Sequence, residues 1–176
     1  LKRFALNELS ENGLESTLAY IDVADGGTDY LCMIVGKVFK GKVFITDVVF
    51  TKENVDITLP LCAGQIQNQK VDYCRVETNN QGSVFIKMLR DKLSPDRILG
   101  VKNTTNKVTR ILMQYGFIKE YFYFRNDYKM GSEYDLFMKQ ILSFQKDGNN
   151  KNDDAPDALA GLSKFIQTMT PDLFNR

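Results

Sequence analysis

Acidic side chains at the edges of three predicted elements are the residues of this chain best suited to chemistry. Asp22 lies near the end of the first predicted strand, Glu77 ends a later one, and Asp153, Asp154 and Asp157 begin the last predicted helix. Carboxylates brought close together repel and raise one another's pKa unless a cation joins them. Two hard cations roughly 4 Å apart can bridge such carboxylates, activate a water and stabilise the leaving oxygen of a phosphodiester. The pattern therefore predicts a site for divalent metal ions.

The composition removes several other chemistries. Among its 176 residues the chain has no histidine, so Ser-His-Asp and Cys-His nucleophile systems are excluded, as are histidine-based zinc and iron sites. Cys32, Cys62 and Cys74 are widely spaced within apolar stretches, and we predict buried free thiols rather than disulfides or a zinc site. Carboxylate and carbonyl oxygens remain, the ligands of Mg²⁺, Mn²⁺ and Ca²⁺.

Each acidic position also has a purely structural explanation. Asp153 or Asp154 could be a helix N-cap with Pro156 in the first turn, and Asp22 could be a polar residue leaving a strand. A cap accounts for one carboxylate, however, and not for three. In a helix the side chains of Asp153, Asp154 and Asp157 point to one side, because they are three and four residues apart. We therefore favour the functional interpretation.

The elements that must position these acids are predicted from hydrophobic periodicity. Three strands open the chain as an antiparallel meander, with a hairpin at Lys40-Gly41, and strands then alternate with helices. This order predicts an α/β fold, a mixed central sheet with helices on both faces. Thr58 is the predicted N-cap of the first helix, with Pro60 in its first turn, and Gly116 the C-cap of the third. Strands are predicted over residues 18–23, 30–39, 42–50, 71–76, 98–101 and 117–124, and helices around 58–66, 85–89, 108–115, 134–142 and 158–169.

Composition and charge limit the possible domain organisation and the possible binding partners. With 43% hydrophobic and 26% charged residues, the chain is predicted to be one domain over residues 1–176, of which 1–16 are an extension or a linker. We expect a cytoplasmic protein, because there is no membrane-spanning apolar run and no signal-peptide pattern. Residues 87–110 hold seven basic side chains and two acidic ones. This strip predicts weak, salt-dependent phosphate contacts through Lys102, Lys107 and Arg110, although a solvated helix face is the alternative.

Three segments resemble the nuclease domain of the large subunit of the DNA-packaging terminases of tailed phages. They are Tyr-Ile-Asp-Val-Ala-Asp-Gly-Gly-Thr-Asp at 20–29, Val-Glu-Thr-Asn-Asn-Gln-Gly at 76–82, and Asn-Asp-Asp-Ala-Pro-Asp-Ala-Leu-Ala at 152–160. The Asp-Asp-x-x-Asp-Ala-Leu pattern in the third segment is the most specific of the three. Their order and spacing also agree with the family along nearly the whole chain.

The resemblance implies a ribonuclease H-like fold and a Mg²⁺- or Mn²⁺-dependent endonuclease that uses two ions to cut concatemeric double-stranded DNA. Asp22 and Glu77 match the family's first two metal-binding acids. In the last motif the resemblance favours Asp154 and Asp157 as catalytic, with Asp153 a further metal-ligand candidate. The chain lacks the phosphate-binding loop of an ATPase motor, so the motor domain is an implied partner, as are the small terminase subunit and the portal, in the host cell cytoplasm. Some relatives use a histidine near this motif. This chain has no histidine, so the role of an outer metal ligand or substrate contact stays unassigned.

Other functions remain open at this point. Another ribonuclease H-like nuclease, such as a Holliday-junction resolvase, would share the acids and differ in substrate. The segment from Ile21-Asp22 to Thr28 also resembles the phosphate-binding hairpin of sugar kinases and actin-like ATPases, which need two such domains. A structural domain of the packaging motor, whose acids only cap elements, would bind no metal.

Overall fold

Strands and helices alternate along most of the chain in the computed structural model, which describes residues 1–10, 12–23, 29–145, 150 and 153–174. The polar stretch predicted at 24–29 and the loop predicted at 146–152 lie mostly outside the described residues. The strands are β1 (Lys2–Phe4), β2 (Leu14–Asp22), β3 (Leu31–Phe39), β4 (Lys42–Thr51), β5 (Tyr73–Glu77), β6 (Ile98–Val101) and β7 (Phe122–Arg125). The helices are α1 (Val55–Asn68), α2 (Gly82–Lys92), α3 (Lys107–Tyr121), α4 (Glu133–Ser143) and α5 (Asp154–Met169).

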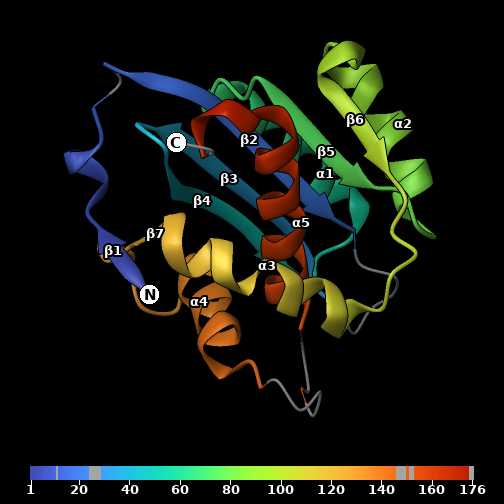
Figure 1. Cartoon of the computed structure of the whole chain (residues 1–176). Helices are drawn as coiled ribbons and strands as arrows, with labels where there is room; N and C mark the ends of the chain where they lie inside the picture. The colour runs from blue at the N-terminus through green and yellow to red at the C-terminus, as the bar shows by residue number, and fades with distance from the viewer. Residues whose placement is uncertain (11, 24–28, 146–149, 151–152, 175–176) are drawn as a thin grey trace.

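The described strands form one mixed sheet in the order β1-β7-β4-β3-β2-β5-β6 (Figure 1). Strands β2, β3 and β4 are the predicted antiparallel meander. Strand β5 runs parallel to β2, and β6 parallel to β5. On the other side β7 runs parallel to β4, and β1 parallel to β7. The predicted α/β class with a mixed sheet is therefore confirmed.

Helices cover both faces of the sheet, as predicted, because neighbouring strand residues point to opposite faces. Tyr20 belongs to a core that β2, β3, β4 and β7 share with α3, α4 and α5. Its neighbour Ile21 belongs to a second core, which α1 and α2 cover. Figure 1 shows α5 lying across the first of these faces. The cysteines are buried and free, which confirms that prediction.

Helix α1 begins before the predicted position. The side chain of Asn54 accepts hydrogen bonds from the backbone N–H groups of Asp56 and Ile57, so Asn54 is the N-cap. The predicted cap, Thr58, is a buried residue inside the helix. Asparagine is the stronger capping residue of the two, and it lies far enough upstream to add a turn. The prediction of Thr58 as the cap, with Pro60 in the first turn, was wrong.

Helix α3 continues beyond the predicted C-cap. Gly116 lies inside the helix, which ends at Tyr121, so the strand starts at Phe122 instead of Phe117. Phe117 packs against Phe174 with ring centroids 4.9 Å apart, and Tyr121 packs on the same ring. The burial of these rings outweighs the tendency of glycine to end a helix. The prediction of Gly116 as a cap was therefore wrong.

Two parts of the first 16 residues belong to the sheet. Lys2–Phe4 pairs in parallel with Tyr123–Arg125, and β2 already begins at Leu14. The segment considered above as an extension or a linker thus contributes an edge strand and the start of a central one. Among the described helices, none has both the length and the apolar character that a membrane crossing requires.

Candidate metal centre

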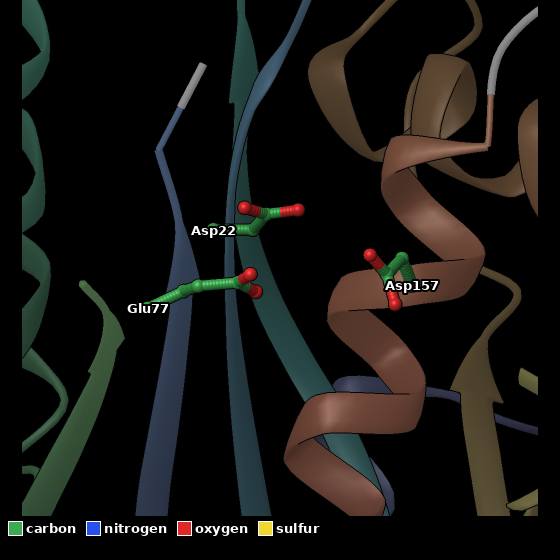
Figure 2. A group of neighbouring side chains, drawn as sticks. All are labelled: Asp22, Glu77 and Asp157. Carbon is green, nitrogen blue, oxygen red and sulfur yellow. The ribbon is translucent and has the colours of Figure 1, made fainter. Parts of the chain in front are cut away.

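Three carboxylates meet at one edge of the sheet. Strands β2 and β5 are parallel neighbours with Ile21 opposite Val76, so Asp22 and Glu77, the last residues of these strands, lie side by side. Figure 2 shows both side chains pointing toward Asp157, which lies in the first turn of α5. Each residue offers a carboxylate oxygen, and these oxygens all lie within 4.8 Å of one another. Oxygen atoms this close are a suitable donor set for hard divalent cations.

The packing of α5 on β2 brings Asp157 to the strand ends. Gly161 lies one turn after Asp157, and a Cβ atom added there would stand 2.3 Å from the ring of Tyr20. Only glycine therefore allows this close approach of helix and strand. At the start of α5 the side-chain oxygen of Gln140 accepts a hydrogen bond from the N–H of Ala155 at 2.7 Å. Helix α4 thus provides a capping group for α5.

Two asparagines and a tyrosine hold the carboxylate of Glu77. The Asn103 side chain donates to Oε2 at 2.8 Å, and that of Asn79 donates to Oε1 at 3.0 Å. Tyr20 donates its hydroxyl to Oε2 at 3.2 Å. The asparagines also bind each other, because the Asn103 N–H donates to Asn79 Oδ1 and the Asn79 side chain donates to the Asn103 carbonyl. The orientation of Glu77, which is 8% exposed, is therefore fixed.

Two cations of α3 contact the aspartates of α5. Arg110 donates to both oxygens of Asp157, from Nε at 3.1 Å and from Nη2 at 2.5 Å. The ammonium of Lys107 lies 2.8 Å from Asp153, 3.3 Å from Asp154 and 3.9 Å from Asp157. Burial alone lowers the pKa of Lys107, but these carboxylates raise it by more, so the ammonium stays charged.

Burial and crowding raise the pKa values of two of the three acids. Burial is the larger cause for Asp22, whose pKa is well above its ordinary value, and the charges of Glu77 and Asp157 add to it. Burial also raises the pKa of Asp157, although the hydrogen bond with Arg110 opposes the rise. The site thus concentrates negative charge that water solvates poorly. Hard oxygen donors with this excess of charge fit Mg²⁺ or Mn²⁺.

Comparison with known proteins relates the fold of this chain to viral terminase nuclease domains. No family model matches the sequence, and no curated protein matches it. Among solved structures, the Mn-soaked terminase nuclease domain of human cytomegalovirus superposes with a TM-score of 0.66 at 14% identity, covering 99% of this chain and 92% of that one. The chain has the fold of a terminase nuclease domain. The predicted resemblance is thereby confirmed at the level of the fold.

Two bacteriophage proteins show the same terminase nuclease fold. The large terminase nuclease domain of bacteriophage SPP1 with bound Mn has a TM-score of 0.62 at 14% identity, covering 89% of this chain and 88% of that one. The corresponding domain of bacterial virus Sf6 has a TM-score of 0.57 at 10% identity, covering 86% of this chain and 89% of that one. At such identities the likeness concerns the fold, and residue roles rest on the geometry.

Not all of the predicted site residues meet in this terminase-type fold. Asp153 and Asp154 contact Lys107 and are absent from the described three-carboxylate group. Asp153 holds the N-cap position of α5, but its side chain makes no capping hydrogen bond. Asp154 accepts a hydrogen bond from the Tyr30 N–H at 3.3 Å. Of the predicted DNA contacts, Lys102 is exposed.

The groups that orient the acids were not predicted. Asn79 follows Glu77 by two residues within the resembling segment, so its position was a usable signal. Asn103 and Gln140 lie in segments without a motif, and each acts on a residue far away in the sequence. Their roles depend on which strand and helix ends are neighbours, and a single sequence does not contain that information.

Proposed function

We propose that this chain is a metal-dependent DNA endonuclease domain of a genome-packaging terminase. The observation that carries the proposal is the group formed by Asp22, Glu77 and Asp157, whose carboxylate oxygens lie within 4.8 Å of one another at the edge of the sheet. The fold supports it, because the similar viral proteins are themselves terminase nuclease domains, one of them with bound Mn.

The three carboxylates would hold two Mg²⁺ or Mn²⁺ ions. Such ions would supply Lewis acids that polarise the phosphodiester and lower the pKa of the attacking water. Glu77 can take part through Oε1, which accepts one hydrogen bond, from Asn79, and so keeps one lone pair, whereas Oε2 accepts two. Asn79 and Asn103 keep it directed at the other acids. Asp154, and then Asp153, remain candidate outer ligands, since Lys107 holds both beside Asp157.

The proposed substrate is concatemeric double-stranded viral DNA, cut in the host cell cytoplasm. The proposed partners are the ATPase motor domain of the same subunit, the small terminase subunit and the portal. Lys102, Lys107 and Arg110 are the proposed phosphate contacts near the site. Lys107 and Arg110 would exchange a carboxylate for a phosphate in this role, because both are bound to acids in the described structure.

Cleavage of a supercoiled plasmid with Mn²⁺ tests the proposal. The domain should relax or linearise the plasmid and stop when EDTA is added, and Asp22→Ala, Glu77→Ala and Asp157→Ala should abolish cutting. Asp91→Ala changes an exposed acid on α2 and serves as the matched control with full activity. Normal cutting by the Asp22 and Glu77 variants would refute the nuclease assignment.

Two further comparisons sharpen this experiment. Asp153→Ala and Asp154→Ala show which aspartate at the start of α5 binds metal besides Asp157. A variant that removes a metal ligand should lose cutting activity, while its stability without metal is unchanged or higher. A four-way junction offered beside a linear duplex separates a terminase from a junction resolvase, and the proposal expects no preference for the junction.

A further inference from the structure

A row of lysines and aromatic rings crosses the sheet away from the acids. The register places Lys37 of β3 opposite Phe44 of β4, Phe44 opposite Tyr123 of β7, and Tyr123 opposite Lys2 of β1. Directly paired residues point to the same face of a sheet. Lys42 and Phe39, paired with each other, belong to this face because they lie two residues from Phe44 and Lys37.

This row lies on the same side of the sheet as Val35, but beyond the core that α1 and α2 form there. The alternate residues of β4 and β7, such as Val43 and Phe122, belong to the core under α3, α4 and α5. Phe39, Phe44 and Tyr123 belong to neither core, and all three are half-buried. They form a cluster of their own, in which Phe44 stacks on Tyr123 with centroids 5.0 Å apart.

Three of the lysines lie over aromatic rings, and Lys2 also donates a hydrogen bond to the backbone carbonyl of Glu120. The ammonium groups of Lys2 and Lys42 lie 5.2 and 5.4 Å from the centroid of Tyr123, and that of Lys40 lies 5.1 Å from Phe39. Among the described residues, none of these lysines, nor Lys37, forms a salt bridge. Four positive charges therefore lie on this part of the sheet, and within the described part of the chain none of them is paired with an acid.

We propose that this lysine–aromatic face, made of Lys2, Lys37, Lys40 and Lys42 around Phe39, Phe44 and Tyr123, binds the phosphate backbone of duplex DNA. Lys37 and Lys2 stand three strand spacings apart, about 14 Å. This span is comparable with the roughly 12 Å width of the major groove, so lysines at its two ends can reach phosphates on both strands. The choice of DNA as the occupant rests on the proposed function.

This duplex is separate from the one at the acids. Lys37 is six residues along β3 from Leu31 at the acid end, which is about 20 Å, and it lies on the opposite face from α5. Duplex DNA is stiff over such distances and cannot lie on both faces at once. The face therefore holds a second segment of DNA, outside the cutting site.

DNA binding measured in EDTA tests the inference without any cutting. A labelled 24-base-pair duplex is titrated with the domain at several salt concentrations, and fluorescence anisotropy reports binding. Lys37→Gln/Lys42→Gln should weaken binding about tenfold at low salt and reduce the salt slope by about two, one for each lost phosphate contact. Lys2→Gln alone should give about half of that change in slope. Lys129→Gln/Lys164→Gln removes the same charge from exposed positions elsewhere and should change the affinity less than threefold.

Three results would overturn the inference. The first is an equal loss of DNA affinity in both double variants. The second is a 24-nucleotide single strand that binds as tightly as the duplex and loses as much affinity in Lys37→Gln/Lys42→Gln, and the third is an oligoglutamate that competes as strongly as DNA of the same charge. Thermal unfolding confirms that each variant is folded. Loss of plasmid cutting or of Mn²⁺ binding would refute the proposed function alone, because neither enters this assay.

Discussion

Replacing Asp22 with Asn should make the metal-free domain more stable. The substitution keeps the size of the side chain and removes one charge from a group whose oxygens lie within 4.8 Å of one another. Two unit charges at about 4.8 Å repel by roughly 3.5 kcal/mol at an effective dielectric constant of about 20. The free-energy cost of this repulsion has an upper limit, because one of the carboxylates can take up a proton and lose its charge. From an unfolded-state pKa of about 3.9, that limit is about 4 kcal/mol at pH 7.

The expected gain is smaller than this limit. Lys107 attracts the ionised form of Asp22 and offsets part of the repulsion. We therefore expect Asp22→Asn to raise the free energy of unfolding without metal by about 2 kcal/mol. For a domain of this size that gain corresponds to a rise of roughly 4–8 °C in the unfolding midpoint. Most substitutions of buried residues act in the opposite direction.

Divalent ions should reverse the order of stability. An ion at about 100 times its dissociation constant stabilises the folded protein that binds it by about 2.7 kcal/mol. The original domain gains this amount, whereas the variant lacks one ligand and gains less. Thermal unfolding at pH 7, in EDTA and in millimolar Mn²⁺, measures both effects, with the exposed Asp91→Asn as the matched control. A variant less stable than the original in EDTA, or one that gains as much from Mn²⁺, would refute the reasoning.

Three further outcomes are expected. Lys107→Met should tighten Mn²⁺ binding about tenfold, because it removes a half-exposed cation beside the acids; calorimetric titration measures this, and weaker binding would count against it. Asn103→Ala should lower the free energy of unfolding by about 1–3 kcal/mol and weaken Mn²⁺ binding, because Asn103 holds Glu77. Asn106→Ala, which removes the N-cap of α3, should lower the free energy of unfolding by about 1 kcal/mol and leave the Mn²⁺ affinity unchanged. The raised pKa of Asp22 means that the folded state holds this proton more tightly, so metal-free stability should fall as pH rises above about 4 until the folded-state pKa is reached. Urea unfolding at several pH values gives the free energy of unfolding of the original protein and of Asp22→Asn. If this free energy had the same dependence on pH in both proteins, the prediction would be contradicted.

The positions of Asp22 and Glu77 could be predicted because they depend on local signals. Each acid ends a short segment typical of a strand, residues 18–22 or 71–77, and neighbouring parallel strands end at the same edge of a sheet. The choice among Asp153, Asp154 and Asp157 could not be made in this way. It depends on how α5 is rotated about its axis, which the contact of Gly161 with Tyr20 decides.

The surroundings of the acids also lie beyond sequence patterns. Lys107 and Arg110 belong to a basic strip, which suggests phosphate contacts when the strip is considered alone. In the fold their partners are 47 residues away, on α5. Conversely, the lysines of the lysine–aromatic face are spread over β1, β3 and β4 and the hairpin between β3 and β4, and the sheet register brings them together. Local charge density therefore does not show which cations are paired with acids in the fold.

The charge balance at the acids connects the fold to the proposed chemistry. If Asp22, Glu77 and the three aspartates at the start of α5 are all ionised, they carry five negative charges, and among the described residues Lys107 and Arg110 bring two positive charges into contact with them. Three negative charges then remain. One divalent ion would leave one negative charge. Two divalent ions would leave one positive charge, and the single negative charge of a phosphodiester would then make the site neutral. If the proposed function holds, this balance predicts one ion in the free domain and a second ion that binds together with DNA.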